Sequence, residues 1–163
     1  MQVRVADRQR RLAVATAALR KLATIALAGH DAGDGGYEQV GIALVTDVEM
    51  RRLNAAYRRI DRTTDVLSFD LRPVRSPGEP LAGEIVISTD RVVIQARRYR
   101  VTQAHELARL LVHGLLHLSG HDHQAAGERA RMRAAERAAL RAAASTIPGL
   151  LAPGNSARSS RPA

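Results

Sequence analysis

The chain has 163 residues, no cysteine, no tryptophan and one phenylalanine. This length fits one domain with a single hydrophobic core. The lack of cysteine excludes a disulfide framework and any cysteine-ligated metal site, so a bound metal must use His, Asp or Glu. No apolar run reaches the roughly 20 residues that cross a bilayer, and the N-terminal stretch does not fit a secretory signal, so we expect a cytoplasmic protein.

The net charge is +9, and Lys21 is the single lysine among 25 basic residues. A strong arginine bias with abundant alanine more often reflects genome base composition than function. The excess positive charge still attracts polyanions and favours salt-dependent association with nucleic acid. Charge alone therefore permits a nucleic-acid partner but identifies no site.

The first part of the chain alternates strand and helix patterns. The periodicity predicts a strand at 2–6, a helix at 9–28, a loop at 30–36 and a strand at 40–46. Asp47 is placed to cap a following helix that ends near Arg58. We expect this helix to bury one face, made of Met50, Leu53, Ala56 and Tyr57.

The second part begins with strands and ends with helices. It predicts strands at 66–71 and 84–88 and helices at 89–99, 103–119 and 124–144. Prolines and a glycine between the two strands exclude a further central strand there. Beyond Ile147 the composition turns to Pro, Gly, Ser and Arg, which predicts a single domain over 1–147 and a disordered tail over 148–163.

Interleaved strands and helices favour an α+β fold, layered as in α/β proteins. We expect one domain with a small mixed sheet of about four strands, packed with about five helices. We expect the helix at 103–119 to be the central one and to carry a candidate metal site, made of histidines, at its end.

Histidines at the end of the 103–119 helix carry the clearest chemical pattern. His113 and His117 are four residues apart, so on a helix both imidazoles lie on one face, with about 5–6 Å between their Cβ atoms. Gly120 readily takes the left-handed conformation that ends a helix and turns the chain. The turn lets His123 swing back as a third ligand. Three neutral imidazoles suit zinc and leave a fourth position open for water, which is typical of a catalytic site.

Other polar residues nearby keep alternatives open. His121 competes with His123 for the third ligand position, and the imidazole set also accepts Ni, Cu or Fe. Glu106 falls on the same face of the helix as His113 and His117, about 10 Å from them along the axis at 1.5 Å per residue. This position suggests a group just outside the ligands. His105 is interpreted as an ordinary polar residue, and His30 as a loop residue.

The same histidine spacing occurs in the metzincin proteases, whose pattern begins H-E-x-x-H. Here Gly114 stands in the second position, where those enzymes carry their general-base glutamate. The sequence therefore disfavours peptide hydrolysis by that mechanism.

A wider set of motifs carries a family resemblance. They are Leu53-Asn54, Tyr57-Arg58, Asp61, Thr64 to Phe69, Gly83 to Ser88, Leu110 to His123, Met132 and Glu136. In these residues the chain resembles the YbeY family of bacterial ribosomal-RNA maturation factors, which are metal-dependent, single-strand-specific endoribonucleases. The string H-G-x-L-H-L-x-G-x-D-H, in order with T-D-V-L-S-F, makes the resemblance specific.

The resemblance implies one zinc ion on His113, His117 and His123, and an RNA-facing cleft in which Arg58 is the functional basic residue. Arginine suits a phosphate because its planar guanidinium donates two parallel hydrogen bonds. The alternative for Arg58 is a surface salt bridge with Asp61. Glu84 is a second candidate catalytic residue that orients a ligand or a water, with a solvated carboxylate at a strand end as its alternative.

The chain departs from the family pattern in three places. Glu84 stands where Asp is usual, Asp70 where Pro is usual, and His121 where Tyr is common. None of these removes an expected ligand. The first two leave the shape of the cleft open, and the third keeps His121 as a possible ligand.

The resemblance implies hydrolysis of single-stranded RNA in ribosomal RNA processing, with maturation of the small-subunit rRNA 3′ end and ribosome quality control as its setting. Water or the 2′-hydroxyl can act as the nucleophile. It also implies partners among small ribosomal subunit proteins and an assembly GTPase, and no membrane. The alternatives are a non-catalytic assembly factor for the small ribosomal subunit with a structural zinc, and a zinc peptidase or amidase.

Overall fold

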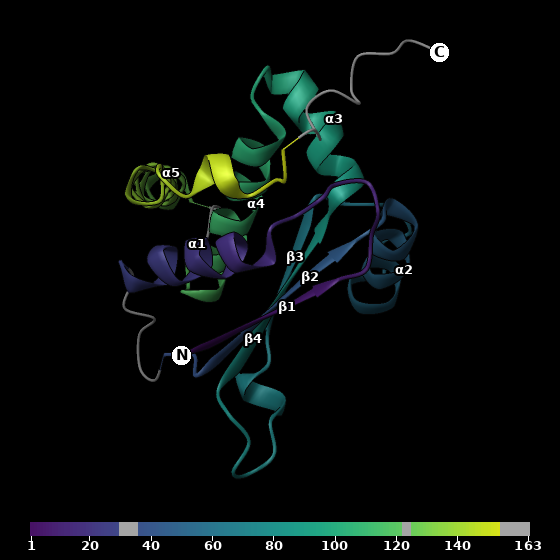
Figure 1. Ribbon diagram of the computed structural model, residues 1–163. Helices are drawn as coiled ribbons and strands as arrows, with labels where there is room; N and C mark the ends of the chain where they lie inside the picture. The colour runs from purple at the N-terminus through teal and green to yellow at the C-terminus, as the bar shows by residue number, and fades with distance from the viewer. Residues whose placement is uncertain (30–35, 122–124, 154–163) are drawn as a thin grey trace.

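A four-stranded mixed sheet organises the computed structural model, which describes residues 1–29, 36–121 and 125–153 (Figure 1). The strands are β1 (Gln2–Asp7), β2 (Gln39–Val45), β3 (Val66–Asp70) and β4 (Ala82–Ser88). Their order is β1-β2-β4-β3. The first three strands in this order are parallel, and β3 runs antiparallel to β4 at the edge.

Helices cover both faces of the sheet (Figure 1). They are α1 (Thr16–Ala28), α2 (Asp47–Arg58), α3 (Thr89–Tyr99), α4 (Gln103–Leu118) and α5 (Ala126–Ala142). Successive residues of a strand point to opposite faces. Ile85 and Ile87 therefore join the larger core with α1, α4 and α5, whereas Val86 joins a smaller core with Met50 of α2. The expected α+β architecture, a small mixed sheet packed with helices, is confirmed.

α4 is the central helix and the one that bears the paired histidines. Thr102 caps its start by accepting a hydrogen bond from the His105 amide at 3.0 Å. Its end has the glycine turn that the sequence predicts, with Gly120 at a φ of 88°. The amides of Gly120 and His121 donate to the carbonyls of His117 and Leu116, which is the Schellman arrangement.

The first helix is shorter than its periodicity predicts. It begins at Thr16 rather than near residue 9. The side chain of Gln9 donates to the Leu12 carbonyl and accepts from the Leu12 amide, both at 2.9 Å. This pair of bonds closes a loop that buries Leu12 without a helix.

Two expectations for α2 are also corrected. Thr46, not Asp47, is the N-cap, since its hydroxyl accepts from the Glu49 amide. Ala56 and Tyr57 are exposed instead of buried, Tyr57 to 68%, and Asn54 takes the inward position by donating to the Arg62 carbonyl. A buried amide is allowed here because it finds a backbone partner.

Order continues past Ile147, where the sequence predicts the start of a disordered tail. Leu150 is fully buried, and its carbonyl accepts from the Ala15 amide at 2.8 Å. Leu151 forms a β-bridge with Val14. Two adjacent leucines outweigh the surrounding Pro and Gly, so residues 148–153 belong to the folded part. Residues 154–163 lie outside the described residues.

Within the described ranges, no helix combines the length and the apolar character needed to cross a membrane.

Candidate metal centre and its cavity

The two histidines of α4 meet through their outer ring nitrogens. Nε2 of His117 lies 3.1 Å from Nε2 of His113, and the ring centroids are 4.7 Å apart. Both residues are partly exposed, whereas Val112 and Leu116 beside them are buried. The two imidazoles therefore lie on one face of α4, as predicted, and the residues beside them on the helix are buried.

The two candidates for the third ligand are His123 and His121. His123 lies outside the described residues. Among residues 1–29, 36–121 and 125–153, no His, Asp or Glu group of three is gathered as a metal site. His121, which is described, is therefore not brought together with His113 and His117 as a ligand set.

The geometry of the pair fits a metal. Two imidazole nitrogens bound to tetrahedral zinc at about 2.0–2.1 Å lie about 3.3 Å apart, close to the observed 3.1 Å. Without a metal, the same separation is bridged by one N–H that donates to the other nitrogen. The two imidazoles thus suit zinc as a pair of ligands.

The histidines form one wall of a cavity of about 570 Å³ at the edge of the sheet. Its other walls come from β3, from the residues before it, and from the end of α2. The lining residues are Arg58, Thr64, Asp65, Val66, Ser68, Asp70, Arg72, Arg109, Leu110, His113, His117, Leu118 and Gly120. Three arginines and two carboxylates among them make the cavity polar and able to take an anionic ligand.

Arg58 reaches this cavity as predicted and is not used in the alternative salt bridge. Asp61 instead binds Arg51, with two hydrogen bonds of 2.8 and 3.1 Å. No ion pair of the described residues includes Arg58. Its guanidinium is therefore available to a ligand in the cavity.

The other two arginines are already paired. Arg72 donates to Asp70 at 2.8 Å and stacks over the ring of Tyr37 at 4.4 Å. The hydrogen bond with Arg72 lowers the pKa of Asp70 below its usual value. Burial, with the nearby charge of Asp70, raises the pKa of Tyr37 to about 12. Tyr37 thus stays protonated near neutral pH and donates to the Leu118 carbonyl at 2.9 Å.

Glu84 is not brought to this site. It pairs across the strands with Gly41 and Phe69, and its Cγ would lie 3.6 Å from a Cβ at Gly41. Its neighbour Ile85 faces α4, so Glu84 points to the α2 face of the sheet. Glu84 does not line the cavity of the histidines, and its role in orienting a ligand or a water stays a prediction. Side chains alternate along β4, so Glu84, one position before Ile85, falls on the face opposite to α4.

Gly114 is explained by close packing. A Cβ at this position would lie 3.0 Å from Cγ2 of Ile85 and 3.1 Å from Oγ of Ser68. Ser68 also donates to the Gly114 carbonyl at 3.1 Å. The position faces the sheet rather than the cavity. A general-base glutamate of the metzincin kind would have to displace Ile85 and Ser68.

Two charged residues that sequence reasoning gave no role lie next to His113. Glu136 of α5 has its Oε2 3.4 Å from Nδ1 of His113 and its Oε1 3.9 Å from Nη1 of Arg109. Arg109 donates to Glu106 at 2.7 and 3.0 Å, and this bond raises its pKa. Glu106 therefore holds Arg109, which lines the cavity. The i,i+3 spacing of Glu106 and Arg109 indicates their ion pair in the sequence. The contact of Arg109 and His113 with Glu136 of α5 leaves no such local signal.

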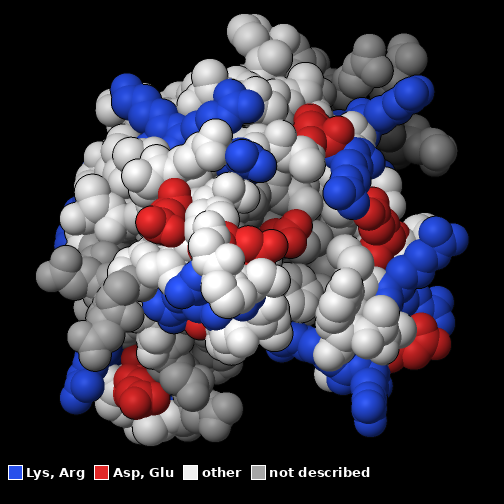
Figure 2. Space-filling view, turned by 90° about the horizontal axis from the view of Figure 1, so that it is seen from below, with Lys and Arg blue, Asp and Glu red and all other residues white. Residues whose placement is uncertain are grey.

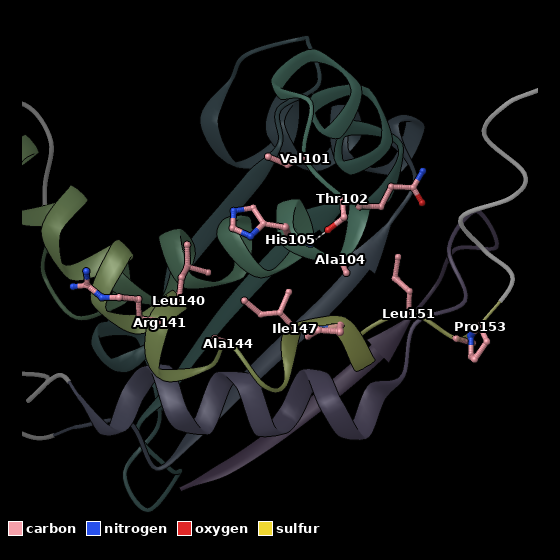
Figure 3. Close-up of a pocket in the computed structure, with 13 residues that line it drawn as sticks. Val101, Thr102, Ala104, His105, Leu140, Arg141, Ala144, Ile147, Leu151 and Pro153 are labelled. Carbon is pink, nitrogen blue, oxygen red and sulfur yellow. Dashed lines mark hydrogen bonds between the residues drawn. The ribbon is translucent and has the colours of Figure 1, made fainter.

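A second, larger cavity of about 840 Å³ lies away from the histidines (Figure 3). It is bounded by the start of α4, the end of α5 and the turn at Ile147–Gly149. Leu140 and Ile147 line it together with His105. His105 is thus separate from the metal pair, as its interpretation as an ordinary polar residue predicts.

Charge on the face seen from below is mixed rather than uniformly basic (Figure 2). Arginine or lysine side chains alternate there with acidic ones. The positive charge of +9 is therefore not gathered on this face into one broad patch.

A small α+β fold with paired histidines in an arginine-lined cavity defines the class of this protein as an α+β domain with a candidate metal-binding pair. The sequence profile described as "Endoribonuclease YbeY" matches residues 4–144. The chain belongs to this YbeY family.

Known relatives agree with the assignment. Proteins named Endoribonuclease YbeY are 50% identical over 102 residues in Chloroflexus aurantiacus and 47% identical over 106 residues in Roseiflexus sp.. These matches cover 58% and 61% of this chain and 66% of each relative, just under two thirds of their length. The relative from Desulfitobacterium hafniense is 41% identical over 117 residues, which cover 67% of this chain and 74% of that protein.

A solved structure supports the fold. The solution structure of TM1509 from Thermotoga maritima has a TM-score of 0.55 and 25% sequence identity to this chain. The similarity covers 93% of this chain and 98% of that one. The arrangement of the sheet and helices is therefore shared across nearly the whole chain.

Proposed function

We propose that this protein is a zinc-dependent endoribonuclease that cuts single-stranded RNA. The observation that carries the proposal is the pair of Nε2 atoms of His113 and His117, 3.1 Å apart in a cavity that also holds Arg58. The names of the YbeY relatives, which describe endoribonucleases, support the same activity. The substrate class follows from an anion-accepting cavity beside a metal-binding pair.

His113, His117 and His123 would hold one zinc ion, which when bound supplies Lewis acidity at neutral pH. Arg58 binds a phosphate of the RNA backbone and stabilises the negative charge that develops there. Arg72 and Arg109 are paired with Asp70 and Glu106, so they shape the wall rather than supply the first phosphate contact. Water and the 2′-hydroxyl are the two nucleophiles compatible with this arrangement.

The biological setting that we propose is ribosomal RNA processing in the cytoplasm, with small-subunit rRNA 3′-end maturation and ribosome quality control as the roles. Proteins of the small ribosomal subunit and an assembly GTPase are the proposed partners. A peptidase is disfavoured, because Gly114 packs against Ile85 where a protease needs its glutamate.

The test is cleavage of a labelled single-stranded RNA by the purified, zinc-loaded protein. We expect cutting by the wild type, with His117→Ala and Arg58→Ala each reducing the rate by at least about 100-fold, as removal of a charge-stabilising group does. Arg52→Ala is the matched control, because Arg52 is also an exposed arginine of α2 but does not line the cavity.

Equal rates in Arg58→Ala and Arg52→Ala would remove the phosphate role of Arg58. Intact RNA with every protein, together with binding to the small ribosomal subunit that survives zinc removal, would instead support the non-catalytic assembly factor.

A further inference from the structure

The ring of His113 lies between a second histidine and a carboxylate. Its Nε2 is 3.1 Å from Nε2 of His117, and its Nδ1 is 3.4 Å from Oε2 of Glu136. The two histidines come from α4, whereas Glu136 comes from α5. The two nitrogens of one imidazole therefore face two different kinds of partner.

This placement selects one tautomer of His113. A neutral imidazole carries one N–H and one lone pair, and an ionised carboxylate only accepts hydrogen bonds. With Glu136 beside Nδ1, the proton belongs on Nδ1 and the lone pair on Nε2. That lone pair is directed toward His117, where a metal would bind.

Glu136 is itself held in place. Its side chain is only 17% exposed, and Met132 and Ala139 on the same helix are buried in the core. Nη1 of Arg109 lies 3.9 Å from Oε1 of Glu136. Arg109 is anchored in turn by Glu106, whose side chain is 1% exposed. A chain of charged contacts thus leads from the buried Glu106 through Arg109 and Glu136 to Nδ1 of His113.

We propose that Glu136 is a positioning residue that orients His113 for metal binding, with Arg109 holding its carboxylate. A ligating histidine that donates its other N–H to a carboxylate is fixed in tautomer and orientation and becomes a more basic ligand. This inference rests on the proposed function, since it requires a metal at the paired histidines. It adds a residue from α5 that touches neither RNA nor metal.

Two measurements on the full chain test it. The first is zinc affinity by competition with a chelator, and the second is the tautomer of His113 in metal-free protein from ring ¹⁵N chemical shifts. We expect Glu136→Ala to bind zinc about 10–100-fold more weakly and to lose the preference for the Nδ1–H tautomer. Glu136→Gln should fall between the wild type and Glu136→Ala, because an amide oxygen accepts but carries no charge. Glu128→Ala, an exposed glutamate of the same helix, should match the wild type.

Wild-type zinc affinity and an unchanged His113 tautomer in Glu136→Gln and Glu136→Ala would overturn the positioning role and leave the proposed function standing. If Glu136→Ala does not fold, as judged by circular dichroism, the near-isosteric Glu136→Gln decides the question. A wild type that binds no zinc would overturn both proposals.

Discussion

Gly114 illustrates how a single residue separates this site from a protease site with the same histidine spacing. The sequence alone indicates that the catalytic glutamate is missing. The structure adds a packing reason, because a Cβ at Gly114 would lie only 3.0 Å from Cγ2 of Ile85 and 3.1 Å from Oγ of Ser68, so a side chain there must displace them. The close approach packs α4 against β3 and β4.

Gly114→Glu should therefore destabilise the fold rather than create a peptidase. We expect the free energy of unfolding to fall by about 3 kcal/mol or more, from overpacking and from burial of a carboxylate. Urea denaturation measures the change. Gly127→Glu on α5 is the control, since a Cβ there meets nothing within 4 Å. If both variants are as stable as the wild type, α4 does not need a glycine at this position.

At the scale of elements, local signals predict the site better than they predict its surroundings. The i,i+4 spacing and the glycine stop correctly placed His113, His117 and the turn at Gly120, because helix geometry links residues that are close in sequence. The sequence did not show that Glu84 lies on the face away from α4, since periodicity does not reveal which face of a strand α4 will cover. Glu136 was not assigned a role, because the contact between α5 and α4 depends on tertiary packing.

The segment after α5 also belongs to this scale. We expect Leu150→Ala to lower the free energy of unfolding by about 2–5 kcal/mol, the usual loss for a fully buried leucine. A chain that ends at Pro153 should retain the stability of the full chain, since it keeps Leu150 and Leu151. Thermal and urea unfolding compare the three proteins. A Leu150→Ala variant with wild-type stability would place the end of the domain at Ile147.

At the scale of the whole molecule, the order of the strands creates the site. β3 lies at the sheet edge, so α4 on one face and the end of α2 on the other both reach the same cavity. Arg58 and the histidines are thus brought together from opposite sides of the sheet. The composition predicted one domain and the interleaved pattern predicted a mixed sheet, but neither could show which strand lies at the edge.

The central claim is that the paired imidazoles of α4 hold a metal ion. The most direct measurement is the zinc content of purified protein after equilibration with zinc and removal of excess metal. We predict one zinc per chain in the wild type and in His105→Ala, whose histidine lies in the other cavity, and less than a tenth of that in His117→Ala, since each lost ligand weakens binding strongly. One zinc per chain retained in His117→Ala, or none in the wild type, would contradict the account.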